Sequence, residues 1–554
     1  MTTLQVPTPA YAQSLLSSRS SSPSSGGEKT TTVILEPGTQ PDYVYDNALP
    51  PWRAAIRRWV VKSLRWESEC IANMQRVVRR PWLDTYFVYT STLGTHTFFM
   101  TVLPAFFFFG YPTCGRGLVQ ILSFGVYTST FVKDSICSPR PYTPPVTRLT
   151  IGTHHLEYGF PSTHSTNSLS VALYIFTLCL SLPPWGLAIT SALLSFYIFS
   201  IVYGRLYCAM HSFTDCIAGC LIGTLIWSIQ WAWQDRIEQF MAIKGPLGKP
   251  RSEPRSEWSC TVPTITILMG LLLINQHPEP VDDCPCFEDA IAFVSVVMGT
   301  TLGRWHGSQA GLDAESGFFH SLTPGWQLAN LNDWLTFFGF ALLKMLVGIA
   351  AIFLWRLVMK TVLLAMLPPF YRIISHVVTL PTRRFYTPAT QYTSVPQENG
   401  LHLTPSLIDI PTSEPGPKHS LHASIASGSI AKQRGAQNGR EKWPAPVNDV
   451  EISTDRFNVV KHYDASVITK VVVYAGIGWI SSEMLPAMFE IFGWGVKSGG
   501  RQWFAICLST RSGSSSLRFA GDGHTVWRRI GNLLHQAGYN GWLVHVFVRI
   551  CTHG

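Results

Sequence analysis

Long apolar runs separated by short polar stretches dominate the middle of this 554-residue chain. The runs are about 16 to 27 residues long, the length of a helix that crosses a hydrocarbon core of about 30 Å. They predict membrane-spanning helices near 84–109, 118–133, 165–183, 185–204, 214–233, 260–275, 288–304, 335–357 and 468–492. We therefore expect an all-α, polytopic membrane bundle of about 8–9 transmembrane helices.

Polar segments flank these runs. Residues 1–50 are rich in Ser, Thr and Pro, and they predict a disordered tail. Residues 51–82 interleave Arg and Lys with Trp, Ile, Val and Leu, which is typical of a basic amphipathic helix at a membrane surface. A cytosolic flank that only sets the orientation of the chain is the alternative.

The rest of the chain divides at a second polar stretch. Residues 83–367 are the predicted transmembrane domain, with a core at about 118–233, and residues 368–465 are a predicted disordered loop. A C-terminal transmembrane helix is expected at 466–495. Residues 496–554 have neither span length nor clean periodicity, so we assign no structure to them.

Composition favours a membrane protein. Only 14% of the residues are charged and 46% are hydrophobic, whereas about a quarter of the residues of soluble domains are charged. The net charge of +9 suits a membrane surface or an anionic substrate. The 12 cysteines lack the spacing of a metal site or a disulfide framework, and the pair Cys284-Pro-Cys286 is a weak signal.

Three groups of polar residues stand where predicted spans begin or end. The first, KDSICSPRP, carries Lys133 and Arg140, two cations that can converge on one anion. The alternative is that these basic side chains only extend to the polar surface of the membrane.

The second polar group, PSTH, places Ser162 and His164 at the start of a span. Free N–H groups, a hydroxyl and a histidine can bind an anion there, although a plain helix-start signal with an incidental histidine is the alternative.

The third polar group, GRLYCAMHSFTD, joins the fourth and fifth spans. Arg205 ends one span and His211 begins the next. If this segment is helical, Asp215 lies on the same face as His211, and its carboxylate can accept the proton of one ring nitrogen. The other ring nitrogen is then available as a nucleophile. A structural ion pair is the alternative.

The alternation of the spans places the three groups together. One round trip across the membrane separates each group from the next, so all of them face the same side of the bilayer. The sequence therefore predicts a single site that contains Lys133, Arg140, Ser162, His164, Arg205, His211 and Asp215.

This set of side chains suits phosphate chemistry. Three cations and helix-end N–H groups can neutralise the oxygens of a transferring phosphoryl group. The sequence has no carboxylate cluster for a two-metal mechanism, so we expect neither a metal nor a cofactor. His211 can attack phosphorus while His164 protonates the leaving alkoxide, and water activated by His164 can then hydrolyse the phosphohistidine.

Taken together, the three groups resemble the motifs of the type 2 phosphatidic acid phosphatase (PAP2) superfamily. Lys-x6-Arg-Pro corresponds to Lys133 through Arg140-Pro141, Pro-Ser-x-His to 161–164, and Ser-Arg-x5-His-x3-Asp to 204–215. Gly204 replaces the serine of the third motif, and Thr163 stands where many members have glycine. The resemblance implies phosphate binding by Lys133, Arg140, Ser162 and Arg205, with His211 as nucleophile, Asp215 as its orienting partner and His164 as general acid and base.

Within that superfamily, YGFPSTHS and YGRLYCAMHSFTD are similar to fungal long-chain base 1-phosphate phosphatases, a likeness that covers roughly 50–365 and 465–495. It implies the endoplasmic reticulum membrane and a sphingoid base phosphate substrate. One alternative is a related phosphatase for phosphatidate, isoprenoid, dolichyl or sugar phosphates. Another is a vanadium-dependent peroxidase, which the membrane-embedded sequence disfavours. A non-catalytic phospholipid-binding or transport protein is the third.

The orientation of the chain is predicted from its basic segments. The stretch 234–258 carries five Lys and Arg residues and lies opposite the predicted site, so the positive-inside rule makes it cytosolic and the site luminal. The basic segment 51–82 also favours the cytosol, and a single span at 84–109 would place the site there too. The resemblance implies a luminal site.

Overall fold

The computed structural model describes residues 36–90, 96–149, 157–242, 260–312, 329–392 and 462–495. Its helices are α2 (Asp42–Ala48), α3 (Pro51–Val78), α4 (Pro81–Thr90), α5 (His96–Phe108), α6 (Pro112–Ile136), α7 (Thr163–Leu178), α8 (Pro184–Tyr207), α9 (Phe213–Met241), α10 (Thr261–Gln276), α11 (Cys286–Ala310), α12 (Leu331–Ser375), α13 (Asp464–Trp479), the π-helix η4 (Ile480–Met484) and α14 (Leu485–Ile491). Two short strands, β1 (Tyr386–Thr387) and β2 (His462–Tyr463), pair in parallel.

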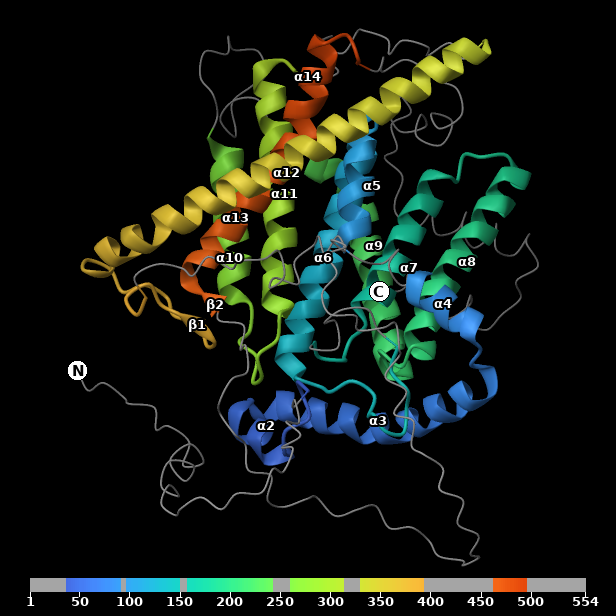
Figure 1. Ribbon diagram of the computed structural model, residues 1–554, viewed down its shortest axis with the longest axis vertical. Helices are drawn as coiled ribbons and strands as arrows, with labels where there is room; N and C mark the ends of the chain where they lie inside the picture. Colours follow the sequence, from blue (N-terminus) through green and yellow to red (C-terminus); the bar gives the residue numbers. More distant parts are fainter. Residues whose placement is uncertain are drawn as a thin grey trace, which may run out of the picture.

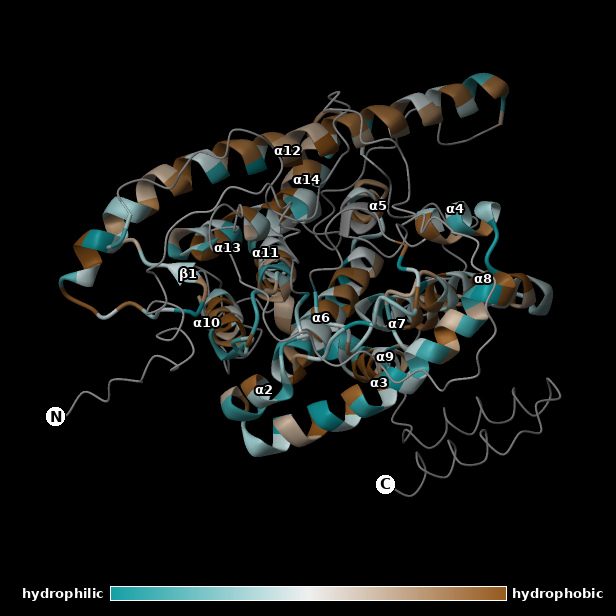
Figure 2. Cartoon of the chain, turned by 60° about the horizontal axis from the view of Figure 1, so that its bottom comes forward, coloured by the Kyte–Doolittle hydropathy of each residue, from teal (hydrophilic) through white to brown (hydrophobic). Residues whose placement is uncertain are grey.

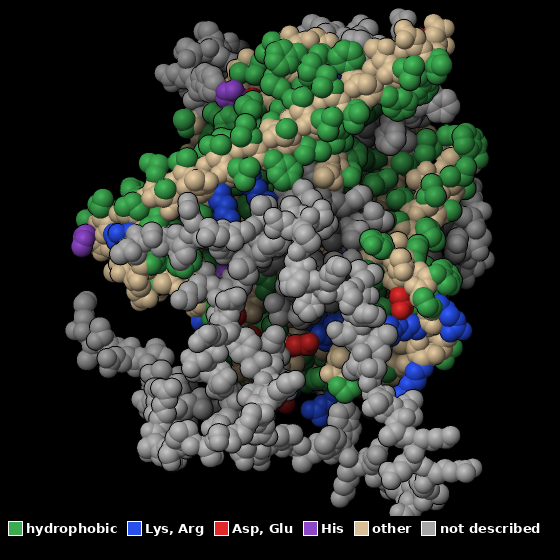
Figure 3. Space-filling view, in the orientation of Figure 1, with side chains coloured by type: hydrophobic (Ala, Val, Ile, Leu, Met, Phe, Trp, Pro, Cys, Tyr) green, Lys and Arg blue, Asp and Glu red, His purple; other side chains and the backbone are tan. Residues whose placement is uncertain are grey.

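Five helical segments among these residues are long and apolar enough to cross a membrane. They are α8, α9, α11, α12 and the continuous segment Asp464–Ile491 that contains α13, η4 and α14. Exposed Leu, Ile, Phe and Val side chains line α8 and α12, as a lipid-facing surface requires (Figure 2 and Figure 3). The prediction of a helical membrane protein is confirmed.

The helices form a bundle in which α6 is central (Figure 1). Helix α6 packs against α7, α9 and α11, and α13 packs on the far side of α11. The main hydrophobic core lies along these contacts and includes Ile121, Leu122 and Val126 of α6 and Tyr474 and Ile477 of α13. Helix α12 crosses the bundle obliquely, and α3 lies across the end where α6 and α8 finish.

Two glycines bring α9 close to the start of α7. A Cβ atom on Gly219 would lie 2.5 Å from the carbonyl oxygen of Ser162, and one on Gly223 would lie 2.5 Å from that of Thr166. Glycines four residues apart let two helix backbones touch, which is a common packing solution in membranes. This close approach holds the N-terminus of α7 beside the N-terminus of α9.

The predicted first span, 84–109, differs in the structure. It is divided between α4, which packs against α8, and α5, which packs against α6. Residues 91–95 between them lie outside the described residues. Apolar content alone made the two helices look like one.

Both predicted disordered segments also contain ordered structure. Within 1–50, α2 is anchored by Tyr45, whose fully buried hydroxyl donates to Asp282 at 2.8 Å. Within 368–465, the 45-residue helix α12 continues through Pro368 and Pro369 to Ser375. Residues 1–35 and 393–461, and the tail 496–554, lie outside the described residues.

Candidate active site

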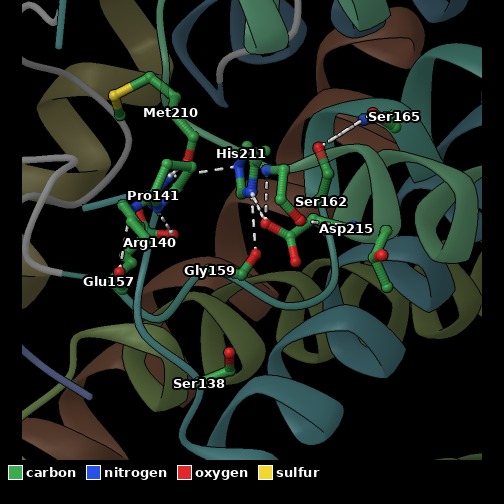
Figure 4. A network of polar contacts seen from close by, with 12 residues as sticks. Ser138, Arg140, Pro141, Glu157, Gly159, Ser162, Ser165, Met210, His211 and Asp215 are labelled. Carbon is green, nitrogen blue, oxygen red and sulfur yellow. Dashed lines mark hydrogen bonds and ion pairs between the residues drawn. The ribbon is translucent and has the colours of Figure 1, made fainter. Parts of the chain in front are cut away.

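The predicted site residues lie at the ends of four neighbouring helices. Figure 4 shows that Arg140, Ser162, His211 and Asp215 lie close together. Lys133 lies in the last turn of α6 and Arg205 in the last turn of α8. Ser162 is the N-cap residue of α7, and Ser212, beside His211, is the N-cap residue of α9. The structure therefore gathers the three sequence motifs at one end of the bundle, as the alternation of spans predicts.

The two cations of the first motif share a carboxylate. Lys133 Nζ lies 2.6 Å and Arg140 Nη2 3.6 Å from Glu157 Oε2. Arg140 also donates through Nε to the Glu157 carbonyl at 2.9 Å and through Nη1 to the Met210 carbonyl at 2.7 Å. Both cationic side chains are buried, so this network fixes their positions.

The buried ring of His211 is held by a backbone carbonyl. His211 Nδ1 lies 2.8 Å from the Gly159 oxygen, and His211 Nε2 lies 3.3 Å from Arg140 Nη1. A carbonyl oxygen can only accept, so Nδ1 carries the proton. The lone pair is therefore on Nε2, on the side of the ring that faces the cation.

Asp215 lies near His211 but has a different hydrogen-bond partner. Its Oδ2 is 3.7 Å from His211 Nδ1 and accepts from the Ser212 N–H at 2.8 Å. The Asp215 N–H donates to Ser212 Oγ at 3.2 Å, which completes a capping box at the start of α9. His211 precedes the helix, so its contact with Asp215 at 3.7 Å does not lie on a helix face as predicted. The Asp215 carboxylate instead holds the start of α9 beside the ring.

The second motif begins α7. Ser162 Oγ accepts from the N–H and the hydroxyl of Ser165 at 3.3 and 3.0 Å. The Ser162 N–H donates to the Asp215 carbonyl at 3.0 Å and so joins α7 to α9. His164 is half-buried in the first turn of α7, and its charge acts on His211.

Arg205 completes the cationic side of the site. Its backbone carbonyl accepts from the N–H groups of Met210 and His211 at 3.0 and 3.3 Å, which fixes the turn between α8 and α9. The guanidinium is buried, and its Nε has no hydrogen-bond partner among the described residues. A buried donor without a partner is costly in a folded protein. It is therefore available to an anion that enters the site.

Burial and positive charge set the protonation of the site. Burial, followed by the charges of Arg140 and Arg205, lowers the pKa of His211 well below its ordinary value. Burial also lowers the pKa of Arg140 to about 10, although Glu157 opposes that shift. His211 is thus neutral near pH 7, as a nucleophile must be, while the guanidinium beside it is charged.

The structure also adds groups that sequence reasoning missed. The carboxylate of Glu157 and the carbonyl of Gly159 hold the cations and the histidine ring. A signal for Glu157 was present, because it is the only acidic residue between Arg140 and His164. No sequence pattern identifies a backbone carbonyl as the partner of a distant histidine.

One group among the described residues has donor atoms of the kind that bind metals. The ligand atoms of Asp134, Cys284 and Cys286 lie within 4.8 Å of one another. The two cysteines are joined by a disulfide, and thiolates rather than disulfides are the usual sulfur ligands. None of these three side chains belongs to the predicted phosphate site.

Comparison with known proteins agrees with the motifs. Residues 115–239 match the PAP2 superfamily. The chain is 31% identical to a dihydrosphingosine 1-phosphate phosphatase of Schizosaccharomyces pombe, over 82% of this chain and 95% of that protein. It is 30% identical to a dihydrosphingosine 1-phosphate phosphatase of Saccharomyces cerevisiae, over 60% and 75%, and 27% identical to mouse sphingosine-1-phosphate phosphatase 2, over 44% and 69%. No solved structure matches the chain significantly. With its motifs gathered in one site and this similarity along most of its length, the chain belongs to the PAP2 superfamily.

Proposed function

We propose that the protein is a membrane lipid phosphatase that hydrolyses sphingoid long-chain base 1-phosphates to the free base and phosphate. The observation that carries this proposal is the buried His211 ring, whose Nδ1 faces the Gly159 carbonyl and whose Nε2 lies 3.3 Å from Arg140 Nη1. The names of the similar fungal and mouse proteins support the choice of substrate.

In the first step, His211 Nε2 attacks phosphorus, and the bond between phosphorus and the ester oxygen breaks. Lys133, Arg140 and Arg205 neutralise the phosphoryl oxygens, and Ser162 and the N–H groups at the start of α7 add hydrogen bonds. His164 protonates the departing alkoxide. The Gly159 carbonyl stabilises the positive charge that develops on the ring, because it accepts a hydrogen bond from the Nδ1–H group.

In the second step, His164 removes a proton from water, and the resulting hydroxide attacks the phosphohistidine. The bond between phosphorus and Nε2 breaks, and inorganic phosphate leaves. Asp215 keeps the start of α9 in place through its capping box, so that the His211 ring returns to the same position. Asp215 therefore acts as a positioning residue.

A phosphate-release panel tests this function. The full-length protein in detergent is given a sphingoid base 1-phosphate, phosphatidate or an isoprenyl phosphate at equal surface concentration. We expect the highest kcat/KM for the sphingoid base phosphate and no release by the His211→Ala variant. Faster turnover of phosphatidate would move the substrate to another branch of the superfamily, and unchanged release by the variant would exclude the mechanism.

We further propose that α3 lies on the membrane surface beside the site. Trp52, Trp59 and Trp66 are exposed and seven residues apart, so they share one face of the helix. Tryptophan is enriched at membrane interfaces. Maleimide labelling in vesicles tests the placement: Trp59→Cys should be protected, whereas Arg65→Cys, exposed and about 120° round the helix from Trp59, should react. Equal labelling of both would contradict it.

We also propose the endoplasmic reticulum membrane, eight or nine spans and a luminal site. Adding α6, α7 and α10 to the five longest apolar segments gives eight, and the basic stretch 234–258 on the opposite side favours the cytosol. Tags inserted near residue 40 and in the stretch 243–259 test this orientation. Protease should remove only the second tag from sealed microsomes. Removal of the first tag alone would place the site in the cytosol.

A further inference from the structure

Glu157 occupies the position between two cations that a phosphate would use. Its Oε2 lies 2.6 Å from Lys133 Nζ and 3.6 Å from Arg140 Nη2. The Glu157 side chain is 17% exposed, whereas those of Lys133 and Arg140 are 2% and 3% exposed. The carboxylate is thus the member of this group that a substrate reaches most easily.

This carboxylate opposes the binding of a simple phosphate monoester. A phosphoryl group bound by Lys133 and Arg140 would lie within a few ångströms of Glu157. Like charges at that separation repel strongly in a partly buried site. A substrate that brings a positive charge next to its phosphate removes this repulsion and gives Glu157 a new partner.

A sphingoid base 1-phosphate has that charge distribution. Its primary ammonium group is on the carbon next to the one that bears the phosphate ester, four bonds from phosphorus. Four bonds span at most about 5 Å. A carboxylate in contact with the phosphate-binding cations is therefore within reach of the ammonium group of the same molecule.

We propose that Glu157 is an ammonium-binding subsite that selects phosphate monoesters with a primary amine beside the ester, an inference that rests on the proposed function. When the phosphate binds Lys133 and Arg140, Glu157 exchanges part of its contact with them for the substrate ammonium. A phosphate ester without an amine leaves the carboxylate next to the phosphate with no added cation.

The other nearby carboxylates are less suited to this role. Asp134 has a side chain that is fully buried. Asp215 is fully buried as well, and its Oδ2 is engaged at the start of α9. Glu157 combines partial exposure with contact to both cations of the first motif.

The test compares two substrates that differ at the amine, which is a charged ammonium in one and a neutral, acetylated amide in the other. The full-length protein in detergent is assayed with a sphingoid base 1-phosphate and with its N-acetyl derivative, whose amide is neutral. We expect wild type to prefer the amine in kcat/KM by about tenfold or more, the effect of one charged hydrogen bond. Glu157→Gln should reduce this ratio to about one, and Glu157→Asp should retain most of it.

A matched control is Glu36→Gln, which removes the same charge from a glutamate that pairs with Arg148. It should leave the substrate ratio unchanged. If Glu157→Gln lowers both rates but keeps the wild-type ratio, Glu157 only anchors the cations and the inference is overturned. Equal wild-type rates for both substrates would also overturn it, while the proposed function would stand. No wild-type release from either substrate would refute the proposed function itself.

Discussion

The two ends of the helical bundle contain buried arginines in opposite situations. At the start of α6, Arg116 donates to both oxygens of Glu238 on α9, at 2.8 and 2.7 Å. At the other end of the bundle, Arg205 Nε has no hydrogen-bond partner among the described residues. There, one carboxylate, that of Glu157, serves both Lys133 and Arg140.

The difference separates a structural ion pair from a binding site. A bidentate arginine–carboxylate pair satisfies its own charges and joins two helices. An excess of cations leaves donors whose best partner is an external anion, and the fold must tolerate their burial. The same residue type therefore contributes to stability at one end of the helices and to binding at the other.

The largest effect is expected from Arg205→Gln. Loss of one group that stabilises developing charge should lower kcat/KM for phosphate release by about 10²- to 10³-fold. The unfolding temperature should not fall, because Arg205 Nε has no hydrogen-bond partner in the part of the chain that the structure describes. Turnover by the purified variant and thermal unfolding in detergent measure the two effects. A variant that unfolds early but has normal turnover would make Arg205 a structural residue.

Arg116→Gln is the same chemical change at the opposite end and should give the opposite result. Removing one partner of a largely buried ion pair should lower the free energy of unfolding by about 3 kcal/mol. Turnover per folded molecule should stay close to wild type, because Arg116 is far along α6 from Lys133. The double variant with Glu238→Gln should regain part of the lost stability. Strong inactivation without destabilisation would show that Arg116 serves the site and not the stability of the helices.

A smaller effect is expected in the pH dependence of stability. The folded protein holds the pKa of His211 below its ordinary value, so the unfolded chain binds a proton there at higher pH than the folded protein does. The difference in protonation of His211 does not affect stability well above pH 6.5. Below about pH 6.5 it lowers the free energy of unfolding, because the unfolded chain takes up the proton first. Thermal unfolding at pH 7.5 and 5.5 should therefore show a smaller loss for His211→Gln than for wild type. An equal loss would indicate an ordinary histidine.

The sequence predicts the content of the site better than its contacts. Lys133, Arg140, Arg205 and His211 could be placed together because alternating spans bring every second helix end to the same side. The Gly159 carbonyl could not be predicted as the hydrogen-bond partner of His211. That contact depends on where α9 begins, because Ser212 is its N-cap residue and Asp215 takes part in the capping box.

The limits of sequence reasoning in the fold have a similar cause. The order of α2 depends on a contact between Tyr45 and Asp282, which are 237 residues apart in the chain. The local amino-acid composition does not reveal a contact with a distant residue. The polar composition of residues 1–50 therefore predicted disorder where α2 forms. The division of 84–109 into α4 and α5 likewise depends on two different packing partners, α8 and α6.

The central claim is that His211 carries the phosphoryl group during turnover, and rapid quenching tests it most directly. Wild-type protein is mixed with a sphingoid base 1-phosphate labelled in the phosphate, quenched in alkali within one turnover and digested for mass spectrometry. We expect an acid-labile phosphohistidine at His211 that appears before free phosphate and is absent from His211→Ala. Phosphate release with no label on His211, or with the label on another residue, would contradict it.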